Sequence, residues 1–115
     1  MAKFFTFIET DVFTKRIVKM VDDETYADLQ AELVKDPTKG KVIQGTGGLR
    51  KIRMAARGKG KRGGARVIYY YHNESIPLYA LDIYAKNRRT DLSAAEKKAA
   101  RKTIAAIGVE HSRRK

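Results

Sequence analysis

Hydrophobic and polar positions follow different periods along the chain, and the changes of period predict its elements. Residues 3–9, KFFTFIE, are aromatic and β-branched and too few for a helix, so they predict a strand. From Asp11 the apolar positions recur at helical spacing, at Phe13, Ile17 and Met20. Thr10 is placed to cap the first turn. We therefore expect a helix that begins at Asp11.

A second helix is predicted directly after the first. Residues 22–24 are acidic, which favours a helix N-terminus, and the apolar positions Tyr26, Leu29 and Leu33 repeat the helical spacing. Pro37 ends the pattern because proline cannot continue a helix.

The middle of the chain predicts a sheet. Short β-type runs cover residues 42–44, 49–55, 65–72 and 78–85, and glycine-rich or turn-forming residues separate them. Strand alternation puts Lys51 and Arg53 on the face opposite Ile52 and Met54, and puts Arg66, Ile68 and Tyr70 opposite Val67, Tyr69 and Tyr71. We expect one face of the sheet to be cationic while the other packs on helices.

A third helix begins at a capping box, Ser93 to Glu96. We expect its inward positions to be Ala99, Ala100, Thr103, Ile104 and Ile107, with Gly108 as its stop and residues 110–115 as a frayed tail. The order strand, helix, helix, several strands, helix predicts one domain over residues 1–115. Its class is α+β, with a mainly antiparallel sheet, two N-terminal helices and one C-terminal helix.

The composition narrows the classes of function. The 115 residues include no cysteine, which excludes disulfides, cysteine-ligated zinc, iron–sulfur clusters and thiol nucleophiles. The formal net charge is +12, and residues 38–90 alone hold 13 basic and 2 acidic residues. A localised basic region attracts polyanions, so nucleic acid is the first partner to consider. We find neither a membrane-spanning window nor a secretory cleavage site, and we expect a cytoplasmic protein that does not bind membranes.

Glycine-rich segments offer two candidate phosphate sites. Residues 58–63, GKGKRG, match a dinucleotide-binding pattern, but they precede a predicted strand where that mechanism requires a helix. A basic loop that contacts RNA through Arg57, Lys59, Lys61 and Arg62 fits better, and a solvated hairpin loop is the alternative. Residues 45–48, GTGG, resemble a phosphate nest, but we favour a tight turn.

Other catalytic chemistry is scarce. His72 and His111 have no third partner at metal-ligand spacing, and His72 is better explained as a surface residue than as a base. Paired carboxylates are missing from the basic region. Chemistry on the basic face therefore falls to lysine, arginine and tyrosine, acting on a phosphate-rich substrate. Tyr70 and Tyr84 are candidates for stacking on a base.

The central motifs resemble a known family of toxins. Residues 43–71, IQGTGGLRKIRMAARGKGKRGGARVIYYY, followed by LDIYAKN at 81–87, resemble the RelE/HigB superfamily, most closely the HigB-type branch with its long Gly/Lys loop. The resemblance implies a compact RelE-like fold and a ribosome-dependent endoribonuclease that cuts mRNA in the ribosomal A site, without a cofactor or metal. It also implies three partners: the 70S ribosome with its ribosomal RNA, mRNA, and a cognate HigA-type antitoxin.

The resemblance also implies roles for individual residues. Lys51 and Arg53 match a basic pair that holds the scissile phosphate and acts in proton transfer; arginine cannot be a general base, so Lys51 is the better candidate for that role. Arg66 matches the arginine that stabilises charge on the phosphate in the transition state.

The sequence does not identify which group protonates the leaving oxygen. Lys86 matches a basic residue near the leaving group, although Asn87 occupies that position if the alignment slips by one residue. Because nothing aromatic follows Tyr84, the candidates are Lys86 and Tyr84.

Two further functions are open alternatives. Because no conventional base is evident, the protein is alternatively a non-catalytic RNA- or ribosome-binding module or an inactivated toxin. A sequence-specific DNA-binding protein is less favoured, since the two early helices are acidic and no recognition helix is visible.

Overall fold

The computed structural model describes residues 7–55, 64–73, 76–85 and 92–113. Its elements, in order, are β1 (Phe7–Glu9), α1 (Asp11–Met20), α2 (Asp23–Lys35), β2 (Lys41–Val42), β3 (Leu49–Met54), β4 (Ala65–Tyr70), β5 (Leu78–Ala85) and α3 (Ala94–Arg113). The α+β class is confirmed. Among the described helices, none is long and apolar enough to cross a membrane.

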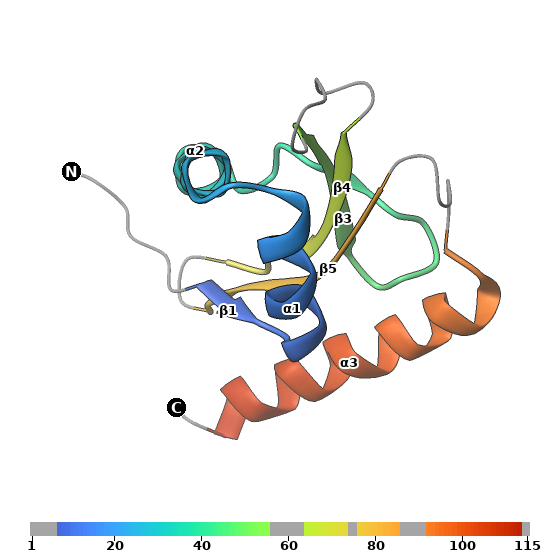
Figure 1. Ribbon diagram of the computed structural model, residues 1–115. Helices are drawn as coiled ribbons and strands as arrows, with labels where there is room; N and C mark the ends of the chain where they lie inside the picture. Colours follow the sequence, from blue (N-terminus) through green and yellow to red (C-terminus); the bar gives the residue numbers. More distant parts are fainter. Residues whose placement is uncertain (1–6, 56–63, 74–75, 86–91, 114–115) are drawn as a thin grey trace.

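The strands form one sheet in the order β1-β5-β4-β3-β2. The pairs β2–β3, β3–β4 and β4–β5 are antiparallel, and only β1 runs parallel to its neighbour, β5. The predicted mainly antiparallel sheet is therefore confirmed. α1 and α2 lie on one side of the sheet, and α3 crosses on the other (Figure 1).

Side chains cap both of the first two helices. Thr10, the predicted cap of α1, accepts the Phe13 N–H on Oγ1 at 3.1 Å. α2 follows the predicted acidic start, where Asp22 Oδ1 accepts the Thr25 N–H at 2.8 Å. Thr10 also ties the start of α1 to the sheet, because its backbone N–H donates to the Ala80 carbonyl at 3.0 Å and its hydroxyl to the Leu81 carbonyl at 2.7 Å.

One hydrophobic core lies between the sheet and the first two helices. Its members include the predicted inward residues of α1 and α2 and the alternate residues of the strands: Phe13, Ile17, Leu29, Leu33, Ile52, Met54, Val67 and Tyr69. The Tyr69 hydroxyl donates to the Pro37 carbonyl and accepts the Gly40 N–H, both at 2.9 Å. A Cβ on Gly40 would lie 2.7 Å from that hydroxyl, so the close approach requires glycine.

A second core occupies part of the opposite face, on which the cationic residues were expected, so helices pack on both faces of the sheet. Leu49, Ile68 and Tyr70 are apolar residues on the face that carries Lys51 and Arg53. They pack with side chains of α3, namely Ala100, Ile104 and Ile107. Their apolar surface needs cover from water, and α3 supplies it for this half of the face.

The capping box of α3 forms as predicted. The Ser93 N–H donates to Glu96 Oε1 at 2.9 Å, and Ser93 Oγ accepts the Glu96 N–H at 3.1 Å. Two details of the prediction are wrong. Ala99 and Thr103 are exposed. The helix also continues past Gly108 to Arg113, because Gly108 does not adopt the positive φ by which a glycine ends a helix.

The glycine-rich segment before β3 is a tight turn, as we favoured. Gly45 and Gly47 have φ of 81° and Gly48 has φ of 125°, conformations that suit glycine. Thr46 is fully buried between them, and its hydroxyl donates to the Ile43 carbonyl and accepts the Leu49 N–H. The strand predicted at 42–44 forms one residue earlier, at Lys41–Val42. The first four residues of the strand predicted at 3–9 lie outside the described residues.

Candidate functional site

The three central strands place Arg53, Arg66 and Tyr84 in one row across the sheet. Arg53 of β3 is directly opposite Arg66 of β4, and Arg66 is directly opposite Tyr84 of β5. Neighbouring strands lie about 4.8 Å apart, so the three backbones span about two such spacings. We call this set the Arg53–Arg66–Tyr84 row.

Lys51 extends the cationic surface along β3. It lies two residues before Arg53 on the same face, a separation of about 7 Å along the strand, and it pairs with Ile68. Arg53 is exposed and Lys51 is half-buried, so both can reach a ligand above the sheet. The alternation predicted for these residues is confirmed, because Ile52 and Met54 point into the opposite core.

Arg66 is a buried cation without a balancing charge among the described residues. Its side chain sits on the central strand with 8% of its surface exposed. Nη1 donates to the Ala65 carbonyl over 3.3 Å, and no carboxylate in the described residues forms an ion pair with it. Like charges directly opposite one another in a sheet repel, so Arg53 and Arg66 together favour an anion between or above them.

The carboxylate on the three central strands already accepts hydrogen bonds from other groups. Asp82 is the only acidic residue of β3, β4 and β5. Its Oδ1 accepts from Arg16 Nη1 of α1 and from the Ile83 N–H, both at 2.7 Å. These contacts hold the carboxylate toward α1 and leave the row positively charged.

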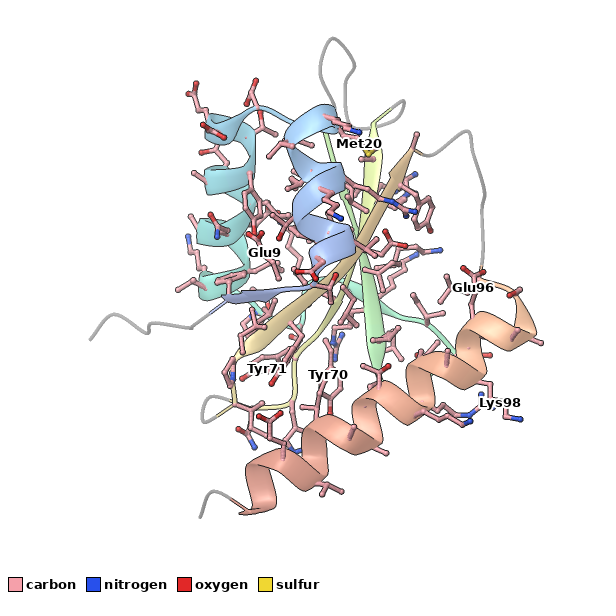
Figure 2. The ribbon with its side chains drawn as sticks, turned by 60° about the horizontal axis from the view of Figure 1, so that its bottom comes forward. Glu9, Met20, Tyr70, Tyr71, Glu96 and Lys98 are labelled. Atoms are coloured by element: carbon pink, nitrogen blue, oxygen red, sulfur yellow. The ribbon has the colours of Figure 1, made fainter. Side chains whose placement is uncertain are left out.

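The two tyrosines predicted to stack on a base have different surroundings. Tyr84 is 7% exposed and stands in the row while also packing in the second core. Tyr70 lies on β4 four residues beyond Arg66 and packs against α3 (Figure 2), and burial raises the pKa of its hydroxyl. The structure thus brings Tyr84, and not Tyr70, to the arginines.

His72 lies with Tyr70 and not with the row. Its Nδ1 is 3.2 Å from the Tyr70 hydroxyl, and the side chain is exposed just beyond the end of β4. In the part of the chain that the structure describes, no three His, Cys, Asp or Glu side chains are grouped so that they could hold a metal ion.

Several predicted site residues lie outside the described residues. These are Arg57, Lys59, Lys61 and Arg62, for which the sequence predicts a loop, together with Lys86 and its alternative Asn87. Their roles in RNA binding and in protonation of the leaving oxygen stay predictions.

Sequence reasoning missed the contribution of α1. Arg16, Lys19 and Met20 line an open hollow that also contains Tyr84. Arg16 and Asp82 are 66 positions apart, and local periodicity carries no signal for such a contact. The solvent-facing cations of α1 were the only hint in the sequence.

The chain matches a family model over nearly all of its length. The family is described as the RelE toxin of the RelE/RelB toxin–antitoxin system, and the match covers residues 10–115. This range contains α1 to α3 and all three residues of the Arg53–Arg66–Tyr84 row. The chain therefore belongs to the RelE toxin family, the toxins of RelE/RelB toxin–antitoxin systems.

Proposed function

We propose that this protein is a ribosome-dependent endoribonuclease that cleaves mRNA in the ribosomal A site and so inhibits translation. Membership in the RelE family supports the general activity. The observation that carries the proposal is the buried Arg66 directly opposite Arg53, with no carboxylate partner among the described residues. A phosphodiester supplies the negative charge that this pair favours.

The reaction that suits these residues uses the 2′-hydroxyl of the RNA itself. The 2′-oxygen attacks the adjacent phosphorus, the O2′–P bond forms, and the P–O5′ bond breaks. The products are a 2′,3′-cyclic phosphate and a 5′-hydroxyl. Lys51 takes the proton of the 2′-hydroxyl, and either Lys86 or Tyr84 gives a proton to the departing 5′-oxygen.

Arg66 and Arg53 act on the charge that develops at the non-bridging phosphate oxygens. Because Arg66 is buried and held on the central strand, little reorganisation is needed when that charge appears. Removing one such preorganised donor costs on the order of 10²- to 10³-fold in rate.

The proposal also includes the branch of the family and the type of antitoxin. Residues 43–71 with their Gly/Lys loop support the HigB-type branch, and hence a HigA-type antitoxin as the cognate partner. The loop cations Arg57, Lys59, Lys61 and Arg62 contact ribosomal RNA or mRNA. An antitoxin that covers the row needs an acidic segment to complement the two guanidinium groups.

The test uses wild-type protein and Arg66→Ala on ribosomes programmed with a defined mRNA. We expect wild type to produce new 5′ ends in the A-site codon only when ribosomes are present. Arg66→Ala should bind ribosomes yet cleave at least 100-fold more slowly. Arg66→Lys keeps the charge but not the two-pronged geometry, and its rate should fall between the two.

Three outcomes would count against the proposal. Ribosome binding by wild type without new 5′ ends would identify a non-catalytic binder. Equal cleavage by wild type and Arg66→Ala would leave an enzyme whose site lies elsewhere. Cleavage of free RNA at the same rate as ribosome-bound RNA would remove the ribosome from the mechanism.

A further inference from the structure

An open hollow of about 700 Å³ lies at the edge of the sheet beside the Arg53–Arg66–Tyr84 row. α1 lines it with Arg16, Lys19 and Met20, β5 with residues 82–85, and α3 with Glu96. In Figure 2, Met20 lies at the C-terminal end of α1 and Glu96 lies near the start of α3.

The hollow lies next to Tyr84, at the β5 end of the Arg53–Arg66–Tyr84 row. β1 pairs with β5 only along residues 78–80, so residues 81–85 of β5 have β4 on one side and, among the described residues, no strand on the other. Tyr84 belongs to both the row and the hollow, because it is directly opposite Arg66 and also lines the hollow. A phosphate bound at Arg66 therefore places the neighbouring nucleotide over Tyr84 and toward α1.

The chemistry of the lining suits a nucleotide. Arg16 is held by Asp82 at 2.7 Å, while Lys19 is exposed and has no hydrogen-bond or ion-pair partner among the described residues. The Lys19 ammonium can thus approach a phosphate without breaking a contact seen here. Met20 is half-buried and offers a polarisable thioether surface to the face of a base.

We propose that this hollow binds the ribonucleotide next to the scissile phosphate, with Lys19 at that nucleotide's other phosphate and Met20 beside its base. The inference rests on the proposed function, because it assumes that the scissile phosphate lies at Arg66. It makes α1 part of the substrate site, in addition to its role in covering the sheet.

The first test observes binding at Met20. A short RNA analogue with 2′-deoxy sugars is bound but not cleaved, because it lacks the attacking hydroxyl. In protein labelled with ¹³C at the methionine methyl groups, its titration should shift the Met20 resonance. Met54 is only 3% exposed, within the core against which Met20 packs, and cannot touch the ligand; it is the internal control and should shift much less. Equal shifts at both methyl groups, or none at Met20, would overturn the proposal.

The second test uses matched variants in the programmed-ribosome assay. Lys19→Ala should lower kcat/KM about tenfold, mainly through a higher KM, because it removes a contact made in both the bound and the transition state. Lys15→Ala removes the same charge one helical turn away, outside the hollow, and should stay within twofold of wild type.

The outcomes separate the hollow from the catalytic proposal. If Lys19→Ala and Lys15→Ala change kcat/KM equally, the hollow is not a nucleotide site, although cleavage that depends on Arg66 would stand. If wild type does not cleave at all, the proposed function fails, and the Met20 titration alone decides whether the hollow binds a nucleotide.

Discussion

Replacing Arg66 with methionine should make the protein more stable while removing its activity. The guanidinium is buried, faces Arg53, and donates one long hydrogen bond of 3.3 Å to the Ala65 carbonyl. Relief of a directly opposed like-charge pair contributes about 0.2–1 kcal/mol. An apolar side chain of similar length also removes the cost of burying a charge that has no ion-pair partner among the described residues. After allowing for the lost hydrogen bond, we expect the free energy of unfolding to rise by about 1 kcal/mol, a Tm increase of roughly 4 °C.

The assay is urea unfolding of purified Arg66→Met without RNA, compared with Arg50→Met. Arg50 lies on the same sheet, but its Nη1 donates to the carbonyls of Thr38 at 3.0 Å and Gly40 at 2.8 Å. Its replacement leaves those carbonyls without their partner, so the free energy of unfolding should fall by about 1–2 kcal/mol. Salt screens repulsion between charges, so the gain for Arg66→Met should shrink in 1 M salt.

One result would refute this reasoning. If Arg66→Met is less stable than wild type by more than about 1 kcal/mol, Arg66 is needed for the fold itself. The charge of Arg66 would then be explained by folding and not by anion binding. The proposed site would lose its main support.

Three further predictions concern the scaffold. Tyr26→Phe removes a hydrogen bond of 2.6 Å to Glu9 Oε2 and should lower the free energy of unfolding by about 1–2 kcal/mol. Because burial and Glu9 raise the pKa of Tyr26, wild type should lose stability as the pH rises above about 10, and the variant should lose less, as measured by urea midpoints at pH 8 and pH 11. Gly40→Ala should lower the free energy of unfolding by about 1–3 kcal/mol in the same assay, because the new Cβ would collide with the Tyr69 hydroxyl. Gly108→Ala should raise it by about 0.5–1 kcal/mol, because Gly108 is within α3 and a Cβ there meets nothing within 4 Å; a loss of stability would contradict a helical Gly108.

The helices were predictable because their signals are local. Thr10, Asp22 and Ser93 cap helices within a few residues of themselves, and apolar spacing identifies the buried side chains of α1 and α2. The end of α3 was not predictable in this way. Glycine permits a helix to end but does not force it to, and Gly108 keeps a helical conformation.

The site was predictable only in part. Strand alternation placed Arg53 and Arg66 on one face, but their direct opposition depends on the register of β3 and β4, which alternation does not determine. Strand alternation also made Tyr70 and Tyr84 equally good candidates for stacking on a base. The choice between them depends on where α3 packs, and this is a tertiary contact between distant parts of the chain.

Because β1 pairs with β5, the sheet cannot form completely until β5 has been synthesised. This pairing joins residues 7–9 to residues 78–80, and the Thr10 hydroxyl bonds the Leu81 carbonyl 71 positions later. At about 5–20 residues per second, translation takes roughly 4 to 14 s to pass from the first strand to the last. During that interval the first strand has no partner, and Tyr84 has not yet joined the arginines. A growing chain therefore carries no finished row until Tyr84 has been made, which is well after Arg53 and Arg66 have left the ribosome's catalytic centre.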